Sequence, residues 1–99
     1  MPKRAPELIK SLGYALEELV RGLGIKKKIQ EYEAVLRWDS VVGGPVARAA
    51  SAKKITNGVM LVKVKTSTWR NELSLRKKEI IDKLNQSLGE EIVKDIKFQ

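Results

Sequence analysis

Only carboxylates, lysines and tyrosines could carry out acid–base chemistry in this chain of 99 residues, because it has no histidine and no cysteine. The carboxylate pairs Glu17–Glu18 and Glu90–Glu91 are adjacent in sequence, so their side chains diverge instead of facing each other. Asp39 is the one carboxylate expected to be partly buried, which is more typical of a hydrogen-bond acceptor than of a catalyst. The sequence has neither a Gly-x-x-x-x-Gly-Lys-Ser/Thr phosphate loop nor a Gly-x-Gly-x-x-Gly fingerprint. We therefore predict a protein that is not an enzyme and that holds no metal or cofactor.

Positive charge is concentrated in one part of the sequence. The chain has a formal net charge of +8 at pH 7, and no acidic residue lies between Asp39 and Glu72. The basic residues of that segment are Arg48, Lys53, Lys54, Lys63, Lys65 and Arg70. A field concentrated in this way attracts polyanions, of which nucleic acid is the usual one. The alternative that stays open is ordinary solvation of a pair of strands by lysines.

Two helices are predicted in the first half of the chain. Over Glu7–Leu23, apolar residues spaced three and four apart form the single stripe of an amphipathic helix. The stripe consists of Leu8, Leu12, Ala15, Leu16, Leu19, Val20 and Leu23. A second helix is predicted over Lys26–Val42, where a broad apolar arc indicates burial on more than one side. The run Gly43-Gly44-Pro45 ends this helix.

Asn57 and Gly58 predict a two-residue β-hairpin turn, since both residues accept a positive φ. If Thr56 lies opposite Val59, one face of the hairpin carries the apolar side chains Ile55, Met60, Val62 and Val64. The opposite face then carries Lys54, Lys63 and Lys65 together with Val59 and Leu61. Lys53 is expected to point inward near a strand end, where its amine can reach water. The hairpin is thus predicted to have one core face and one basic face.

The remaining elements complete an α+β domain. A third helix, capped by Ser67 or Thr68, is predicted to run to Leu88, with Leu75 off its apolar stripe. A last strand is predicted over 92–98, and its alternation places Ile92, Ile96 and Phe98 inward and Val93, Asp95 and Lys97 outward. The order α-α-β-β-α-β predicts a single domain over residues 1–99, with a flexible N-terminus over 1–5. Its three-stranded sheet has helices packed on one face and leaves the other face open.

Three aromatic side chains could stack on an unpaired base. Tyr14 is expected to be exposed on the polar side of the first helix, without a stacking role. Trp38 and Trp69 are expected to pack in the core, as tryptophans of small domains usually do.

No segment is predicted to cross a membrane. The longest aliphatic run, Val59-Met60-Leu61-Val62, is far shorter than the ~20 residues that a spanning helix needs. No apolar stretch follows the basic residues at the start, as a signal peptide would require, and a chain without cysteine suits a reducing compartment. We therefore expect a soluble, cytoplasmic protein.

Several short motifs, in this order and spacing, resemble the DciA family of bacterial proteins, once described as a domain of unknown function. They are Trp38-Asp39-Ser40-Val41-Val42-Gly43, the strand from Asn57 to Val64, Trp69-Arg70-Asn71-Glu72-Leu73, Leu84-Asn85 and Ile96-Lys97-Phe98. The resemblance covers nearly the whole chain. It implies a domain similar to the K-homology (KH) fold, although the Gly-x-x-Gly loop with which KH domains clamp nucleotides is absent from this sequence.

The resemblance further implies a role in DNA replication, as a DNA-binding loader or operator of the hexameric replicative helicase. The residues expected to contact nucleic acid are Lys53, Lys54, Lys63, Lys65, Arg70, Lys77 and Lys78, and Leu75 is a weaker candidate for contact with a protein partner. Two alternatives stay open: an RNA-binding KH-like module, and a protein–protein adaptor that binds no nucleic acid.

Overall fold

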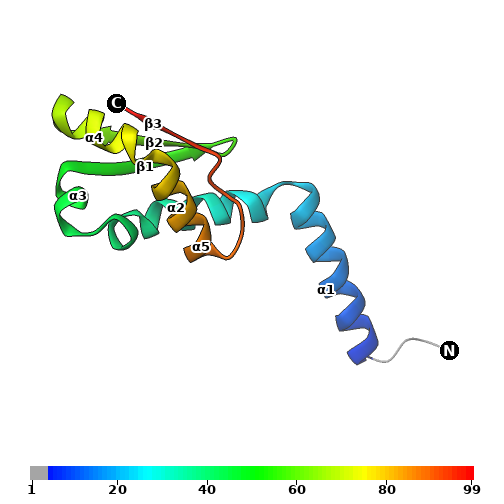
Figure 1. Cartoon of the computed structure of the whole chain (residues 1–99). Coiled ribbons are helices and arrows are strands. Elements are labelled where there is room, and N and C mark those ends of the chain that lie inside the picture. The colour runs from blue at the N-terminus through cyan, green and yellow to red at the C-terminus, as the bar shows by residue number, and fades with distance from the viewer. Residues whose placement is uncertain (1–4) are drawn as a thin grey trace.

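The computed structural model describes residues 5–99, with side chains placed from Leu8 onward. Its helices are α1 (Ala5–Gly22), α2 (Ile25–Val42), α3 (Gly44–Ala49), α4 (Ser67–Leu75) and α5 (Lys77–Leu88). Its strands are β1 (Ala50–Thr56), β2 (Val59–Val64) and β3 (Asp95–Phe98), shown with the helices in Figure 1. The N-terminus expected to be flexible lies outside the described residues, except for Ala5, which begins α1.

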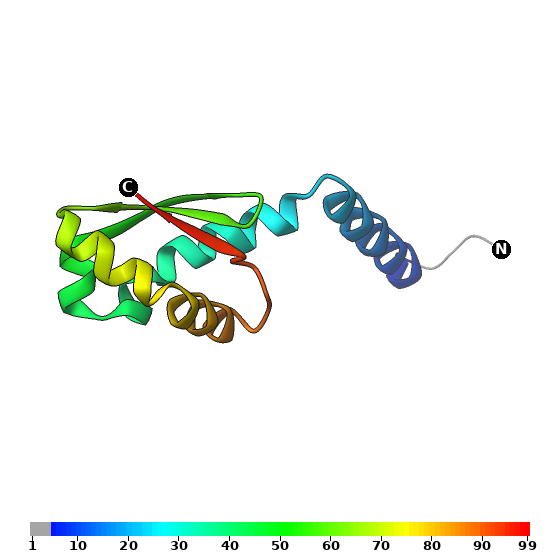
Figure 2. The ribbon, with the colours of Figure 1, turned by 45° about the horizontal axis from the view of Figure 1, so that its top comes forward.

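The strands form one sheet in the order β1-β2-β3, in which β1 and β2 are antiparallel and β2 and β3 are parallel. In Figure 2 the sheet lies above α2, α3 and α5, so its lower face is covered and its upper face is not. The core between the layers contains the fully buried side chains Trp38, Met60, Val62, Leu73, Leu84, Val93 and Ile96. The predicted α+β class and the three-stranded sheet with helices packed on one face are confirmed, and the sheet is mixed.

The predicted hairpin register is also confirmed. Thr56 pairs with Val59, and the turn residues Asn57 and Gly58 have φ angles of 51° and 82°, which a two-residue turn of this type requires. The register shifts between Ala52 and Lys54, so Lys53 is the extra residue of a β-bulge and has no partner on β2. Lys53 is exposed in the middle of β1, and not turned inward near a strand end as expected.

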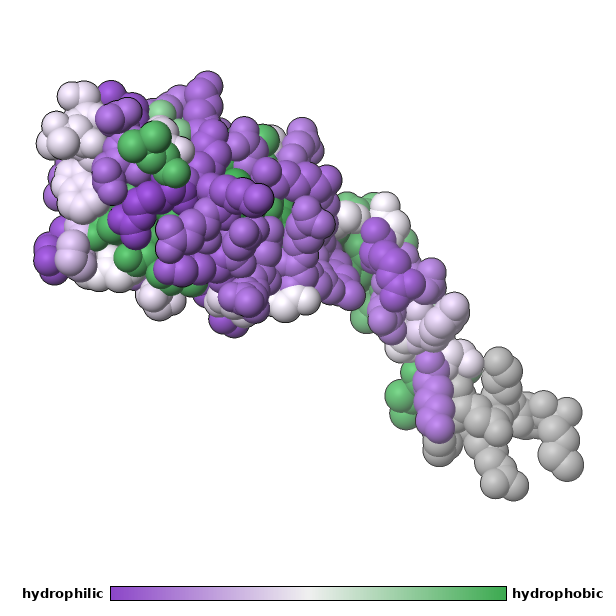
Figure 3. All heavy atoms as spheres, viewed as in Figure 1, coloured by the Kyte–Doolittle hydropathy of each residue, from purple (hydrophilic) through white to green (hydrophobic). Residues whose placement is uncertain are grey.

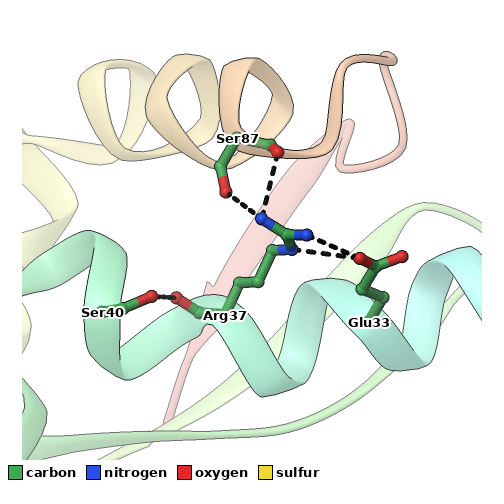
Figure 4. Close-up of polar contacts among 4 residues, drawn as sticks. All are labelled: Glu33, Arg37, Ser40 and Ser87. Carbon is green, nitrogen blue, oxygen red and sulfur yellow. Dashed lines mark hydrogen bonds and ion pairs between the residues drawn. The ribbon is translucent and has the colours of Figure 1, made fainter.

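α2 is tied to the rest of the domain by its central turn. Trp38 is 1% exposed, and its indole Nε1 donates a hydrogen bond of 3.0 Å to the backbone oxygen of Ala50. On the neighbouring side, the Arg37 guanidinium donates to Glu33 within α2 and to the backbone and hydroxyl oxygens of Ser87 at the end of α5 (Figure 4). These bonds hold α2 against both the sheet and α5.

The third predicted helix is two helices. The chain leaves helical geometry at Arg76, where φ is −103° and ψ is 9°, and α4 and α5 meet there. The cap is Thr66, whose side-chain oxygen accepts a hydrogen bond from the Trp69 amide, so the prediction of Ser67 or Thr68 is wrong by one or two residues. Apolar spacing did not reveal the break because the stripes of the two helices are nearly continuous.

The last strand begins at Asp95, three residues later than predicted. The reason is Asn85, whose side-chain amide donates to the Val93 carbonyl and accepts from the Ile92 and Val93 amides. Those backbone groups therefore do not pair with a strand. The segment instead turns Val93 into the core, where it is 0% exposed, so the prediction that Val93 faces outward is wrong.

The apolar stripe of α1 does not pack against the domain. α1 projects from the start of α2 (Figure 1), and the described residues extend over 70 × 21 × 18 Å. Their radius of gyration is 18.6 Å, whereas a compact chain of this length has about 13 Å. α2 packs against both the sheet and α5, as a helix buried on more than one side does, but Ile25, Ile29, Tyr32 and Leu36 of its apolar arc are exposed.

Candidate nucleic-acid interface

The open face of the sheet carries a row of side chains across all three strands. Lys54 on β1 is opposite Leu61 on β2, and Leu61 is opposite Lys97 on β3. Lys63, two residues further along β2, points to the same face and is opposite Ser51. All three lysines are exposed. Because neighbouring strands are about 4.8 Å apart, the Lys54 and Lys97 backbones are separated by roughly 10 Å, with an apolar leucine between them.

The carboxylate of Asp95 lies next to this row of side chains on the open face. Asp95 pairs with Val59 one row away, and its carboxylate lies 3.2 Å from the Lys77 amine. The pKa of Asp95 lies below its ordinary value, chiefly because the backbone amide of Ile96 donates to it and secondly because Lys77 does. Asp95 is therefore ionised at neutral pH, and its charge is offset by an amine from α5.

A groove of about 410 Å³ separates α2 from the edge strand β1. Lys53 and Lys54 line it from β1, and Lys28 and Tyr32 line it from α2. Since Lys54 also belongs to the lysine row, the groove and the open face meet at the edge of β1. The bulge at Lys53 is the feature that brings a second amine to this edge.

The wall of the groove contains the one charged side chain that is buried among the described residues. Glu31 is 9% exposed, and its Oε2 accepts a hydrogen bond of 3.2 Å from the Gly58 amide. The Gly58 carbonyl in turn accepts from the amides of Lys94 and Asp95. The hairpin turn is thus fixed to both α2 and the chain entering β3. Sequence reasoning missed Glu31 and expected partial burial at Asp39, which is exposed.

The seven basic residues predicted to contact nucleic acid do not lie together. Lys54 and Lys63 share the open face, and Lys53 lies in the adjoining groove. Lys65 follows the end of β2 and lines a shallow depression with Arg48 and Trp69. The other three belong to the helices: Arg70 is half-buried, Lys77 pairs with Asp95, and Lys78 lines a hollow on α5.

Two lysines complete the basic surface without having been predicted as contacts. Lys97 lies in the lysine row, and the outward alternation of the last strand was the signal for it. Lys28 lies in the groove at the front of α2. We call Lys54, Lys63 and Lys97, with the adjoining Lys53 and Lys28, the lysine face.

The aromatic residues and Leu75 occupy different settings. Trp38 is in the core as predicted, whereas Trp69 is half-buried and packs at the edge of the core. Tyr14 is 68% exposed, on the polar side of α1. Leu75 is 79% exposed at the end of α4, beside the hollow on α5 that Lys78 lines.

The described residues contain no constellation for catalysis by a metal. Over the placed side chains, no three carboxylates come close enough to hold a metal ion. In the same part of the chain, none of the helices combines the length and the apolar character needed to span a bilayer. The lysine face instead presents hydrogen-bond donors and positive charge on an open surface, which suits binding of an anionic partner.

Comparison with known proteins confirms the resemblance seen in the sequence. The family model described as "Dna[CI] antecedent, DciA" matches residues 11–98. A UPF0232 protein of Mycobacterium tuberculosis is 26% identical over 87 residues, which cover 88% of this chain and 46% of that protein. A UPF0232 protein of Mycolicibacterium smegmatis is 26% identical over 95 residues, which cover 96% of this chain and 47% of that protein. A UPF0232 protein of Rhodococcus jostii is 24% identical over 86 residues, which cover 87% of this chain and 46% of that protein. The chain thus spans just under half the length of these relatives.

Proposed function

The chain belongs to the DciA family, and from this premise we propose that it is a non-catalytic, DNA-binding accessory of bacterial replication that loads or assists the hexameric replicative helicase. One observation supports the DNA-binding part of this proposal above all. The lysine row Lys54–Leu61–Lys97, with Lys63 beside it, lies on a sheet face that no helix covers. A row of exposed amines that runs across neighbouring β-strands is suited to bind successive phosphates of a nucleic acid strand.

The proposed contacts are electrostatic and independent of sequence. Lysine amines neutralise phosphates and release counterions, which supplies most of the affinity in non-specific binding. Leu61 lies between the amines of the row and offers an apolar contact to a base or sugar. A strand that crosses the edge of β1 reaches Lys53 and Lys28 in the groove. The chain has no Gly-x-x-Gly loop, so the proposal uses the open sheet face and no backbone clamp on the nucleotides.

Charge reversal tests the lysine face. The variant Lys54→Glu/Lys63→Glu is compared with Lys10→Glu/Lys26→Glu, which changes the net charge equally at two exposed lysines of α1 and α2 that lie outside the lysine face. Affinity for a labelled single-stranded DNA is measured by anisotropy at low salt. We expect the first variant to lose about tenfold or more in affinity and the second much less, because only the first removes phosphate contacts. Equal losses would mean that only net charge matters, and would reject the interface.

The same titration separates the other two functions. Tighter binding to RNA than to DNA of the same length would favour the RNA-binding module, because 2′-hydroxyl contacts are the difference between the two ligands. No binding to either at moderate salt would favour the adaptor.

The helicase part of the proposal rests on family membership, and Leu75 is proposed as a contact with the helicase. Leu75 is 79% exposed and lines the hollow on α5 together with the apolar side chains of Ile81 and Val93. Co-sedimentation of the chain with the hexameric replicative helicase from the same organism tests the partner. Leu75→Asp is expected to weaken co-sedimentation while leaving DNA affinity unchanged. Leu61→Asp, on the sheet face, is expected to weaken DNA affinity while leaving co-sedimentation with the helicase unchanged.

A further inference from the structure

Two apolar stripes at the N-terminal end of the described chain are exposed along their length. The first stripe consists of Leu8, Leu12, Leu16 and Leu19 on α1 and of Leu23 just after it, and the second of Ile25, Ile29, Tyr32 and Leu36 on α2; these side chains are 42% to 66% exposed. Figure 3 shows apolar side chains along one edge of α1 and where α1 joins α2, next to a hydrophilic face. Contiguous apolar surface of this extent usually marks a site of protein contact.

The α2 stripe is a second apolar face and not a margin of the core. At 100° per residue, Ile29 and Leu36 point almost directly away from Ala34 and Trp38, which are buried under the sheet. α2 therefore has a face committed to the domain and another that remains unpaired. The apolar residues of the second face are spaced three and four apart, as on the buried side of a packed helix. For this reason the sequence predicts burial on more than one side.

The two stripes match each other when α1 and α2 are antiparallel. Counted outward from Gly24, Leu23 corresponds to Ile25 and Leu19 to Ile29. Further from Gly24, Leu16 corresponds to Tyr32 and Leu12 to Leu36. The paired residues lie at equal distances on either side of Gly24, so each leucine of the stripe from Leu12 to Leu23 has an apolar counterpart at its own level of α2, whereas Leu8 lies opposite Ser40. Antiparallel helices pack by interlocking such rows of side chains.

The connection favours pairing between two chains over pairing within one. Only Leu23 and Gly24 lie between the helices, and both are held: the Leu23 amide donates to the Leu19 carbonyl, and the Gly24 carbonyl accepts from Lys28. α1 projects away from α2 in both views (Figures 1 and 2). A short, constrained hinge between elements that would pack on each other promotes exchange of the element with a second copy.

We propose that the occupant of the α2 stripe is α1 of a second copy of this chain, in a two-fold dimer in which each copy gives its α1 to the other. With about 50 Å² still exposed on each apolar side chain, the exchange buries on the order of 900 Å² of apolar surface over both chains. Since roughly 65% of such an interface is apolar, the total is about 1,400 Å², within the range of roughly 1,200–2,000 Å² for specific protein interfaces. The inference depends on this apolar surface alone, and not on the proposed DNA binding.

Cross-linking between two single-cysteine variants tests the exchange directly, because the chain contains no cysteine of its own. Leu16→Cys and Tyr32→Cys chains are purified separately, mixed and oxidised mildly. A disulfide that joins the two variants can form only between chains. The matched control is Tyr14→Cys mixed with Tyr32→Cys, since Tyr14 is exposed on the opposite side of α1. We expect a mixed covalent dimer as the main product of the first pair and only traces from the second. Equal yields would overturn the proposal.

Sedimentation velocity of the full chain gives an independent measurement. We expect a mass of twice 11.1 kDa at high concentration, and at least about tenfold weaker association for Leu16→Asp than for Tyr14→Asp, which adds the same charge. Three glycines inserted after Gly24 should release the constraint and convert the dimer into a monomer with α1 folded back. A wild-type monomer would overturn the proposal. If the double variant Leu16→Cys/Tyr32→Cys then forms an intrachain disulfide, α1 closes on its own α2.

Discussion

Replacing Glu31 by alanine should destabilise the domain through the hairpin turn. Glu31 is 9% exposed, and its carboxylate is the acceptor for the amide of Gly58, which is itself buried. An unsatisfied buried N–H costs about 1–3 kcal/mol, and a hydrogen bond to a charged acceptor contributes about 1.5–3 kcal/mol. We therefore expect Glu31→Ala to lower the free energy of unfolding by about 2 kcal/mol. For a domain of this size, that loss corresponds to a decrease in Tm of roughly 8–16 °C.

Two controls separate this bond from the loss of a glutamate as such. Glu31→Gln keeps an oxygen acceptor at the same position and should cost less than half as much. Glu33→Ala, two residues away, removes only an ion pair with Arg37 between half-exposed side chains (Figure 4), and should cost no more than about 1 kcal/mol. Urea unfolding followed by circular dichroism measures all three variants. The reasoning is refuted if Glu31→Ala is as stable as the wild type, or more stable, because desolvation of the carboxylate would then outweigh its hydrogen bond.

Three further predictions concern the core, the last loop and pH. Trp38→Phe leaves the Ala50 carbonyl without its donor, so we expect a loss of about 1–3 kcal/mol in urea unfolding. Asn85→Ala removes three hydrogen bonds to the chain before β3, and faster amide exchange should appear first in that segment. The pKa of Asp95 is lowered in the folded protein, chiefly by a backbone amide and then by Lys77. Its stabilising effect is therefore present above the ordinary pKa of an aspartate and is lost as the pH falls through the lower, folded value. Asp95→Asn should thus lower the free energy of unfolding at pH 7, and urea unfolding should show this difference shrink as the pH falls toward the lowered pKa of Asp95.

The sequence predicted those features that depend on local chemistry. The Asn57-Gly58 turn requires positive φ at both residues, and this alone set the register that places Lys54 and Lys63 on one face. The bulge at Lys53 could not be predicted, because nothing in an alternating pattern marks one extra residue. The break at Arg76 was missed for the same reason, since a helical period continues across it.

Tertiary hydrogen bonds account for the other differences between prediction and structure. Asn85 withdraws Val93 from the last strand, and Glu31 is buried because a turn distant in sequence needs an acceptor. An amphipathic stripe shows that a helix has an apolar face, but not what covers it. For this reason the pattern of α1 predicted the helix correctly and its packing wrongly.

The salt dependence of DNA binding tests the central claim most directly, namely that the amines of the lysine face contact phosphates. Affinity for a single strand is measured at several salt concentrations for the wild type and for Lys63→Gln/Lys97→Gln. If the five amines of the lysine face neutralise phosphates, log K should fall against log salt with a slope of about −3.5, and the variant should lose roughly two fifths of that slope. A slope near zero, or the same slope in both proteins, would contradict the account.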